Sequence, residues 1–145
     1  MGARTKARKR ARDVLYAADL RGESGVEALE RVIADGEELA NPYTAVIVRG
    51  VSEHVERIDE VLTAQSTDWT LARMPAVDRN VLRIGVWELL WADDVPPAVA
   101  VTEATGLVRE LSTDSSPTFV NGVLGAIQRR VEADGLGEVR GSAAS

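Results

Sequence analysis

The stretch VDRNVLRIGVWELLWA, residues 77–92, is strongly apolar and decides the fold class. Its apolar residues recur every three or four positions instead of every second position, which is typical of a helix and not of a strand. The segment DDVPP that follows, residues 93–97, ends the helix, because proline lacks a backbone N–H and restricts the residue before it. We therefore expect a helix from about residue 76 to residue 92.

The same helical period extends in both directions along the chain, and no segment sustains the alternation of a strand. Asn41-Pro42 and Ser116-Pro117 are typical helix starts, since proline is tolerated at the first helical position. Helices are expected over about residues 5–21, 26–34, 42–65, 98–111 and 117–131, with a short helical turn between residues 68 and 75.

These lengths fit an all-α fold of two stacked helical bundles that form one compact unit. The bundles are expected over about residues 5–66 and 70–132, so that residues 1–132 form the domain. From residue 133 to residue 145, glycine, serine, alanine and scattered charges predict a flexible tail.

The apolar stripes of the first three helices predict which side chains face the core. These are Ala7, Ala11, Val14, Leu15, Ala18, Val26, Leu29, Val32, Ile33, Val46, Val48, Val51, Val55, Ile58, Val61 and Leu62.

The composition restricts the class of protein further. Hydrophobic residues make up 45% of the 145, which is enough for a core. The absence of cysteine excludes disulfides, thiolate metal sites and cysteine catalysis, and it fits a reducing cytoplasm. No apolar run reaches the roughly 18 residues of a membrane span, so we expect a cytoplasmic protein that does not enter a membrane.

No group of residues has the pattern of a catalytic or metal site. His54 is the only histidine, and its neighbour Glu53 points about 100° away from it on a helix. Asp93 and Asp94 fit a helix stop better than an acid–base pair. We therefore expect no metal, no cofactor and no enzymatic activity.

The first twelve residues, MGARTKARKRAR, have a charge opposite to that of the rest of the chain. They contain six of the 17 Lys and Arg and no acidic residue, which leaves 11 basic against 23 acidic side chains in the remainder. On a helix Arg4, Arg8, Arg12 and Tyr16 are four residues apart and share one face, with Lys9 beside them. We expect these guanidinium groups to project outward and bind phosphate, while Tyr16 stacks on an unpaired RNA base.

The basic segment also fits roles that do not involve RNA. It could contact nothing, or it could pair with the acidic body of the protein. An anionic membrane surface is a further alternative, but the segment lacks the Trp, Phe and Leu that such helices bury.

Residues 75 to about 130 closely resemble the NusB family of transcription antitermination factors. Three pieces carry the resemblance in order: VLRIGVWELL (81–90), DVPPAVAVTEA (94–104) and FVNGVLGAI (119–127). The arginine-rich start, ARKRARDVLYAADLRG (7–22), adds to it. The resemblance implies two helical bundles without catalysis. It also implies that the protein binds single-stranded boxA RNA, usually in ribosomal RNA transcripts, together with the small-subunit ribosomal protein that doubles as NusE. That complex joins RNA polymerase and suppresses premature termination.

The resemblance also assigns roles to single residues. Asp78 would face NusE. The sequence departs from the family at Ser115, where an acidic residue is common, and at Thr5, where a basic residue is common. With the basic row described above, the expected RNA-binding set is Arg4, Lys6, Arg8, Lys9, Arg12, Tyr16, Ser115, Ser116, Thr118, Phe119 and Asn121.

Two alternatives remain for the aromatic residues and for the function. Trp87 and Trp91 are four residues apart, which favours core packing but also fits a protein–protein face such as that of a homodimer. Phe119 would be a core residue if the family resemblance did not favour base stacking. The alternative function is a protein-interaction module whose basic N-terminus docks an acidic partner without RNA specificity.

Overall fold

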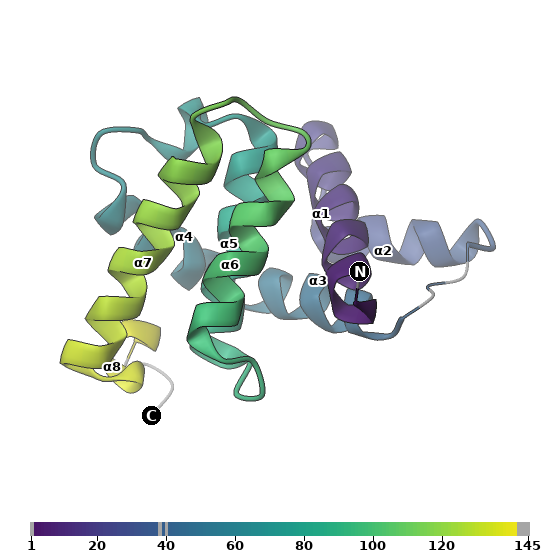
Figure 1. Ribbon diagram of the computed structural model, residues 1–145. Coiled ribbons are helices and arrows are strands. Elements are labelled where there is room, and N and C mark those ends of the chain that lie inside the picture. The colour runs from purple at the N-terminus through teal and green to yellow at the C-terminus, as the bar shows by residue number, and fades with distance from the viewer. Residues whose placement is uncertain (1, 38, 40, 142–145) are drawn as a thin grey trace.

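The computed structural model describes residues 2–37, 39 and 41–141 (Figure 1). Within these ranges the chain forms eight α-helices and one short 3-10 helix and contains no strand, which confirms the all-α prediction. The elements are α1 (Ala3–Arg21), α2 (Gly25–Ala34), α3 (Tyr43–Glu53), α4 (Val55–Gln65), η1 (Leu71–Arg73), α5 (Ala76–Trp91), α6 (Pro97–Arg109), α7 (Ser116–Asp134) and α8 (Leu136–Arg140).

Helices α1, α2 and α3 pack on one another and form the N-terminal group (Figure 1). Alanines and aliphatic residues of α1 are buried at the expected spacing, Ala11 and Leu15 among them. Gly22 ends α1 in the left-handed region, at φ 69°, where glycine is favoured. Ser24 and Glu27 then form a capping box that starts α2.

Helix α5 is the central element, because it contacts α1 and α3 on one side and α4, α6, α7 and α8 on the other. Val81, Leu82, Ile84, Val86 and Leu90 are almost completely buried. The stretch that decides the fold class is therefore the common core of both groups of helices.

The prediction of one helix over residues 42–65 was wrong. The helix is interrupted at His54, whose φ of –110° and ψ of 15° are not helical. After the interruption α4 packs against α5 and α7, so it belongs with α5, α6, α7 and α8 to the C-terminal group. The two groups therefore divide at residue 54 and not near residue 70. The imidazole of His54 stacks on the Trp91 ring at 4.0 Å, which ties the interruption to α5.

Two further expectations need correction. Ile33 and Val46 are about half exposed instead of facing the core, because they lie on the outer edges of α2 and α3. The tail expected from residue 133 is helical over α8. There Val139 is buried, its carbonyl accepts from Arg57 Nε at 3.0 Å, and Arg140 binds the Leu90 carbonyl. Residues 142–145 of that expected tail lie outside the described residues.

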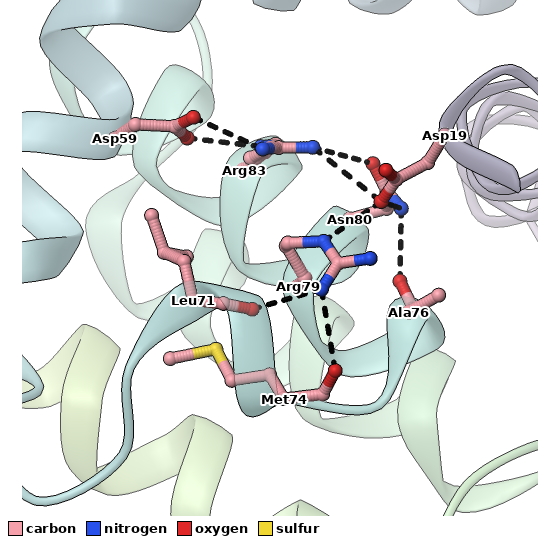
Figure 2. Close-up of polar contacts among 8 residues, drawn as sticks. All are labelled: Asp19, Asp59, Leu71, Met74, Ala76, Arg79, Asn80 and Arg83. Carbon is pink, nitrogen blue, oxygen red and sulfur yellow. Dashed lines mark hydrogen bonds and ion pairs between the residues drawn. The ribbon is translucent and has the colours of Figure 1, made fainter. Parts of the chain in front are cut away.

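A polar network joins the two groups of helices at the first turns of α5 (Figure 2). Asp19 of α1 accepts hydrogen bonds from Arg79 at 2.7 Å and from Asn80 at 2.9 Å. Arg83 binds Asp59 of α4 with two hydrogen bonds of 2.9 and 3.0 Å. Arg79 also donates to the Leu71 carbonyl at 2.8 Å, which fixes the connection that precedes α5. Side chains of α5 thus hold α1, α4 and η1 in place.

Candidate nucleic-acid interface

Arg8 is buried, with only 4% of its surface exposed, so the expectation that its guanidinium projects outward was wrong. Its Nε lies 3.0 and 3.1 Å from the two carboxylate oxygens of Glu88, and its Nη1 lies 2.9 Å from Glu103 Oε1. The Tyr43 hydroxyl donates to the same Glu88 carboxylate. Arg8 therefore joins α1 to α5 and α6 from inside the protein.

The environment of Glu88 explains why Arg8 is held there. Burial raises the pKa of Glu88, and the hydrogen bond from Tyr43 and the charge of Arg8 only partly oppose this. A buried carboxylate without its cation would be strongly destabilising. Burial, with the hydrogen bond to Glu88, also raises the pKa of Tyr43. We infer that this cluster is structural and that it fixes the position of α1.

Arg12 is also buried, at 5% exposure, and the outward orientation expected for it was wrong as well. Its Nη1 donates to the Leu107 carbonyl of α6 at 2.9 Å, and its Nε binds Asp13 at 3.1 Å. This contact places the middle of α1 beside the last turn of α6.

Two further cations of α1, Arg4 and Lys9, are paired with acidic residues from elsewhere in the chain. Arg4 binds Asp94 at 2.8 Å, and its guanidinium lies 4.1 Å from the centre of the Tyr43 ring. Lys9 binds Glu110 at 2.8 Å. The hydrogen bond from Arg4 lowers the pKa of Asp94, and that from Lys9 lowers the pKa of Glu110. The basic segment is therefore largely paired with the acidic body, which was one of the alternatives left open by the sequence.

Lys6 lies on another side of α1. It is exposed and borders a shallow groove of about 250 Å³ that also contacts Leu39, Asn41 and Thr44. Arg10 borders the same groove and pairs with Glu37. The structure thus separates Lys6 from the face that carries Lys9, Arg12 and Tyr16.

The start of α7 provides exposed groups beside the end of α6, and Tyr16 of α1 is exposed as well. Tyr16 is 37% exposed, one helical turn beyond Arg12 on the same face. Thr118 and Asn121 are exposed and line a groove of about 410 Å³ between α6 and α7. Arg109 of α6 lines this groove as well and is exposed. Sequence reasoning missed Arg109, although its place just before the loop that carries Ser115 was a usable signal.

The loop between α6 and α7 presents only part of the expected set. Ser115 is exposed, but Ser116 is completely buried and cannot contact RNA in this conformation. Its hydroxyl accepts from the Thr113 N–H at 3.2 Å and lies 3.1 Å from the Ser112 hydroxyl. Ser116 therefore shapes the loop instead of forming its surface.

Phe119 is half-buried and packs against Trp69, with the two ring centres 4.8 Å apart in an edge-to-face arrangement. Its remaining surface borders a second groove of about 270 Å³, shared with Thr118 and with residues 65–68 after α4. The aromatic face is thus partly occupied by another side chain of the protein.

Asp78 is completely buried, so a direct contact with a partner is not compatible with this structure. It lies in the first turn of α5, and its carboxylate accepts from the Ser112 hydroxyl. Trp87 is buried as expected for a core residue, whereas Trp91 is half-buried under His54.

Two general properties concern the described ranges alone. No helix within them is both long and apolar enough to cross a bilayer. No three or more His, Asp or Glu side chains converge there in a way that could hold a metal ion.

Comparisons with known proteins agree with this arrangement of helices. The model of the NusB family matches residues 5–129. The chain is 67% identical over 129 residues to the transcription antitermination protein NusB of a Nocardioides species, covering 89% of this chain and 96% of the relative. It is 62% identical to the protein of that name from Saccharopolyspora erythraea, covering 88% and 87% of the two chains.

Solved structures show the same fold. NusB of T. maritima superposes with a TM-score of 0.78 at 30% identity, covering 89% of this chain and 92% of that one. A crystal structure of the antitermination factors NusB and NusE in complex with dsRNA gives a TM-score of 0.75 at 32% identity, covering 87% and 96%. The family match spans most of the chain, and the relatives are aligned over nearly their whole length. The chain therefore belongs to the NusB family.

Proposed function

We propose that this protein is a transcription antitermination factor without enzymatic activity. Together with a NusE-type ribosomal protein it binds the boxA element of nascent RNA, usually ribosomal RNA, and joins RNA polymerase in the cytoplasm to suppress premature termination. The observation that carries the proposal is the match of this fold, over 87% of the chain, to the NusB that was solved with NusE and dsRNA. The curated relatives are likewise named as transcription antitermination proteins.

We place the RNA around the end of α6, along the groove between α6 and α7 and the neighbouring Lys9 of α1. Lys9 and Arg109 supply two positive charges, Thr118 and Asn121 supply hydrogen-bonding groups, and Tyr16 supplies an aromatic face. Arginine and lysine bind phosphate, whereas tyrosine stacks on unpaired bases. Ser115 and the exposed part of Phe119 extend this surface toward residues 65–68.

Arg8 and Arg12 take an indirect part in this proposal. Since both are buried against α5 and α6, they hold α1 at the correct distance from the end of α6. Arg4 and Lys6 lie at the other end and on another side of α1, so they would attract RNA over a longer range. The net charge of –6 discourages RNA from binding elsewhere on the protein.

The carboxylates that pair with Arg4 and Lys9 compete with RNA phosphates for these two cations. Asp94 and Glu110 are exposed, so their ion pairs with Arg4 and Lys9 are weak and exchangeable in water. RNA affinity should therefore depend on salt, with a log–log slope of about –0.7 for each phosphate that is neutralised.

The proposal is tested by titrating boxA RNA and a scrambled RNA of the same length and composition, with and without the NusE-type partner. We expect preferential binding to boxA that the partner strengthens and that salt weakens. Equal binding of both RNAs with the partner present would instead support a protein-docking module. Sedimentation of the protein at the same concentrations, with and without boxA RNA, shows whether a homodimer, for which Trp91 offers a partly exposed indole, accompanies or replaces RNA binding.

A further inference from the structure

We propose that Asp78 is a positioning residue that anchors the loop between α6 and α7, and that it does not contact the protein partner. Through Ser112 its carboxylate would hold the loop that leads into Thr118 and Asn121. The RNA part of this inference rests on the proposed function, whereas the anchoring of the loop does not.

A chain of hydroxyl groups connects Asp78 to the loop. The Ser112 hydroxyl donates to Asp78 Oδ1, and the Ser116 hydroxyl donates to Ser112 at 3.1 Å. The Thr113 hydroxyl lies 2.8 Å from Ser116 and 3.2 Å from the Ser115 hydroxyl. The chain thus runs from the exposed Ser115 to a carboxylate that has no exposed surface.

The carboxylate sets the direction of this chain. The Ser112 hydroxyl donates to Asp78, and each hydroxyl has a single proton to donate. Because Ser112 donates to Asp78, it must accept from Ser116, and Ser116 must then accept from Thr113. The Ser115 hydroxyl in turn donates to Thr113. Hydrogen bonds aligned in one direction strengthen one another, so one buried acceptor orders four residues of the loop.

The hydrogen bond from Ser112 stabilises the buried carboxylate of Asp78 as well as the loop. Its second oxygen, Oδ2, is buried and has no hydrogen-bond partner within the described ranges. Asp78 lies in the first turn of α5, where an acidic residue is well placed because the N-terminus of a helix carries a partial positive charge. Burying a carboxylate is unfavourable unless it is hydrogen-bonded. Both the Asp78 carboxylate and the loop therefore need the hydrogen bond from Ser112.

The loop determines where the candidate RNA groups stand. The Thr113 N–H donates to the Ser116 hydroxyl at 3.2 Å, and the Phe119 N–H donates to the Ser115 carbonyl at 3.1 Å. Both bonds lie in the turn that starts α7. If the chain of hydroxyls is broken, the first turn of α7 is no longer held in place. The position of Thr118, which lies in that turn, is then no longer fixed.

The experiment compares Ser112→Ala, Asp78→Ala and Asp78→Asn with the intact protein. Ser52→Ala is the matched control, since the Ser52 hydroxyl is buried without a hydrogen-bond partner in the described part of the chain. Amide hydrogen exchange at Thr113 and Ser116 reports on the loop without any RNA. The affinities for boxA RNA with the partner present, and for the partner without RNA, are measured in parallel.

We expect Ser112→Ala and Asp78→Ala to speed exchange at both amides and to weaken RNA binding about two- to tenfold, which corresponds to one lost hydrogen bond. Affinity for the partner should stay within about twofold, because we expect the free energy of partner binding to change by less than one hydrogen bond contributes. Asp78→Asn keeps an acceptor for Ser112 and should restore most of the protection, and Ser52→Ala should change none of these values. If Asp78→Ala does not fold, Ser112→Ala carries the test alone.

Unchanged exchange at Thr113 and Ser116 in Ser112→Ala would overturn the anchoring of the loop, whatever happens to RNA binding. A loss of partner affinity in Asp78→Asn with RNA binding intact would instead place Asp78 at the partner surface. If the loop amides respond as expected but the intact protein binds boxA and scrambled RNA equally, the anchor stands and the proposed function fails.

Discussion

The guanidinium of Arg8 and the carboxylate of Glu88 face each other inside the protein, with Nε 3.0 and 3.1 Å from the two oxygens. Neither side chain exposes more than 4% of its surface. An arginine from the most basic segment of the chain thus serves as an internal attachment of α1 to α5.

Removing one partner of this pair should lower the free energy of unfolding strongly. Arg8→Met leaves Glu88 buried without its cation, so we expect a loss of about 3–5 kcal/mol in the free energy of unfolding. The double variant Arg8→Met/Glu88→Leu should recover part of that loss, because it removes both buried charges. Arg4→Met, which breaks an exposed ion pair on the same helix, should lower stability by about 1 kcal/mol or less. Urea denaturation followed by circular dichroism measures all three, and equal losses for Arg8→Met and Arg4→Met would contradict a buried pair.

The adjacent carboxylates of Asp93 and Asp94 offer a matched test of competition with RNA. Asp94 pairs with Arg4 of α1, whereas Asp93 pairs with Arg140 of α8 at 3.2 Å. Asp94→Asn frees Arg4 for phosphate, so RNA affinity at low salt should rise about two- to fivefold and the gain should shrink as salt screens it. Asp93→Asn changes the net charge equally and should have a smaller effect. The same gain in both variants would mean that total charge, and not the pairing of Arg4, limits RNA binding.

Gly50 of α3 has no room for a side chain. A Cβ atom there would overlap the indole ring of Trp87. Although alanine favours a helix interior over glycine by about 0.5–1 kcal/mol, the forced movement of Trp87 should make Gly50→Ala destabilising by about 1–3 kcal/mol. Gly106→Ala on α6 is the control, since nothing lies within 4 Å of its Cβ position, and it should stabilise. Calorimetric melting temperatures decide the signs, and a stabilising Gly50→Ala would refute the close packing of α3 on α5.

Asp19 should make stability depend on pH in the acid range. Burial raises the pKa of Asp19, but the hydrogen bonds from Arg79 and Asn80 outweigh it and leave the pKa below its ordinary value (Figure 2). A carboxyl whose pKa is lower in the folded state contributes stability above its ordinary pKa of about 3.9, and this is lost as the pH falls through the folded value. Glu88 acts in the opposite sense. Because its pKa is raised in the folded protein, the stability that its protonated form contributes is lost as the pH rises. The difference in unfolding free energy between the intact protein and Asp19→Asn should therefore shrink below about pH 4, and a constant difference would contradict this account.

Helix ends that depend on local chemistry could be predicted from the sequence. Proline marks the starts of α6 and α7, and α5 and α6 end within two residues of their expected positions. The interruption at His54 could not be predicted, because neither proline nor glycine stands there. At the interruption His54 stacks on Trp91, which is 37 positions away, and α4 then packs against α5 and α7.

In the candidate site too, contacts between residues far apart in the sequence could not be predicted. Arg8 and Arg12 follow the spacing of an exposed basic face, and nothing near them in the sequence indicates burial. Their partners, Glu88 and Leu107, lie 80 and 95 residues away and meet them only after α1 has packed beside α5 and α6. Asp78 and Ser116 were likewise assigned to a surface by family resemblance, whereas their burial results from the packing of α5 against the loop before α7.

Transcription through a terminator placed downstream of boxA shows directly whether this protein suppresses termination. RNA polymerase is assayed with the NusE-type partner, with and without this protein, on templates that carry boxA or its scrambled form. We expect the protein to increase read-through on the boxA template and to have little effect on the scrambled one. Read-through that is unchanged by the protein, or increased equally on both templates, would contradict the proposed function.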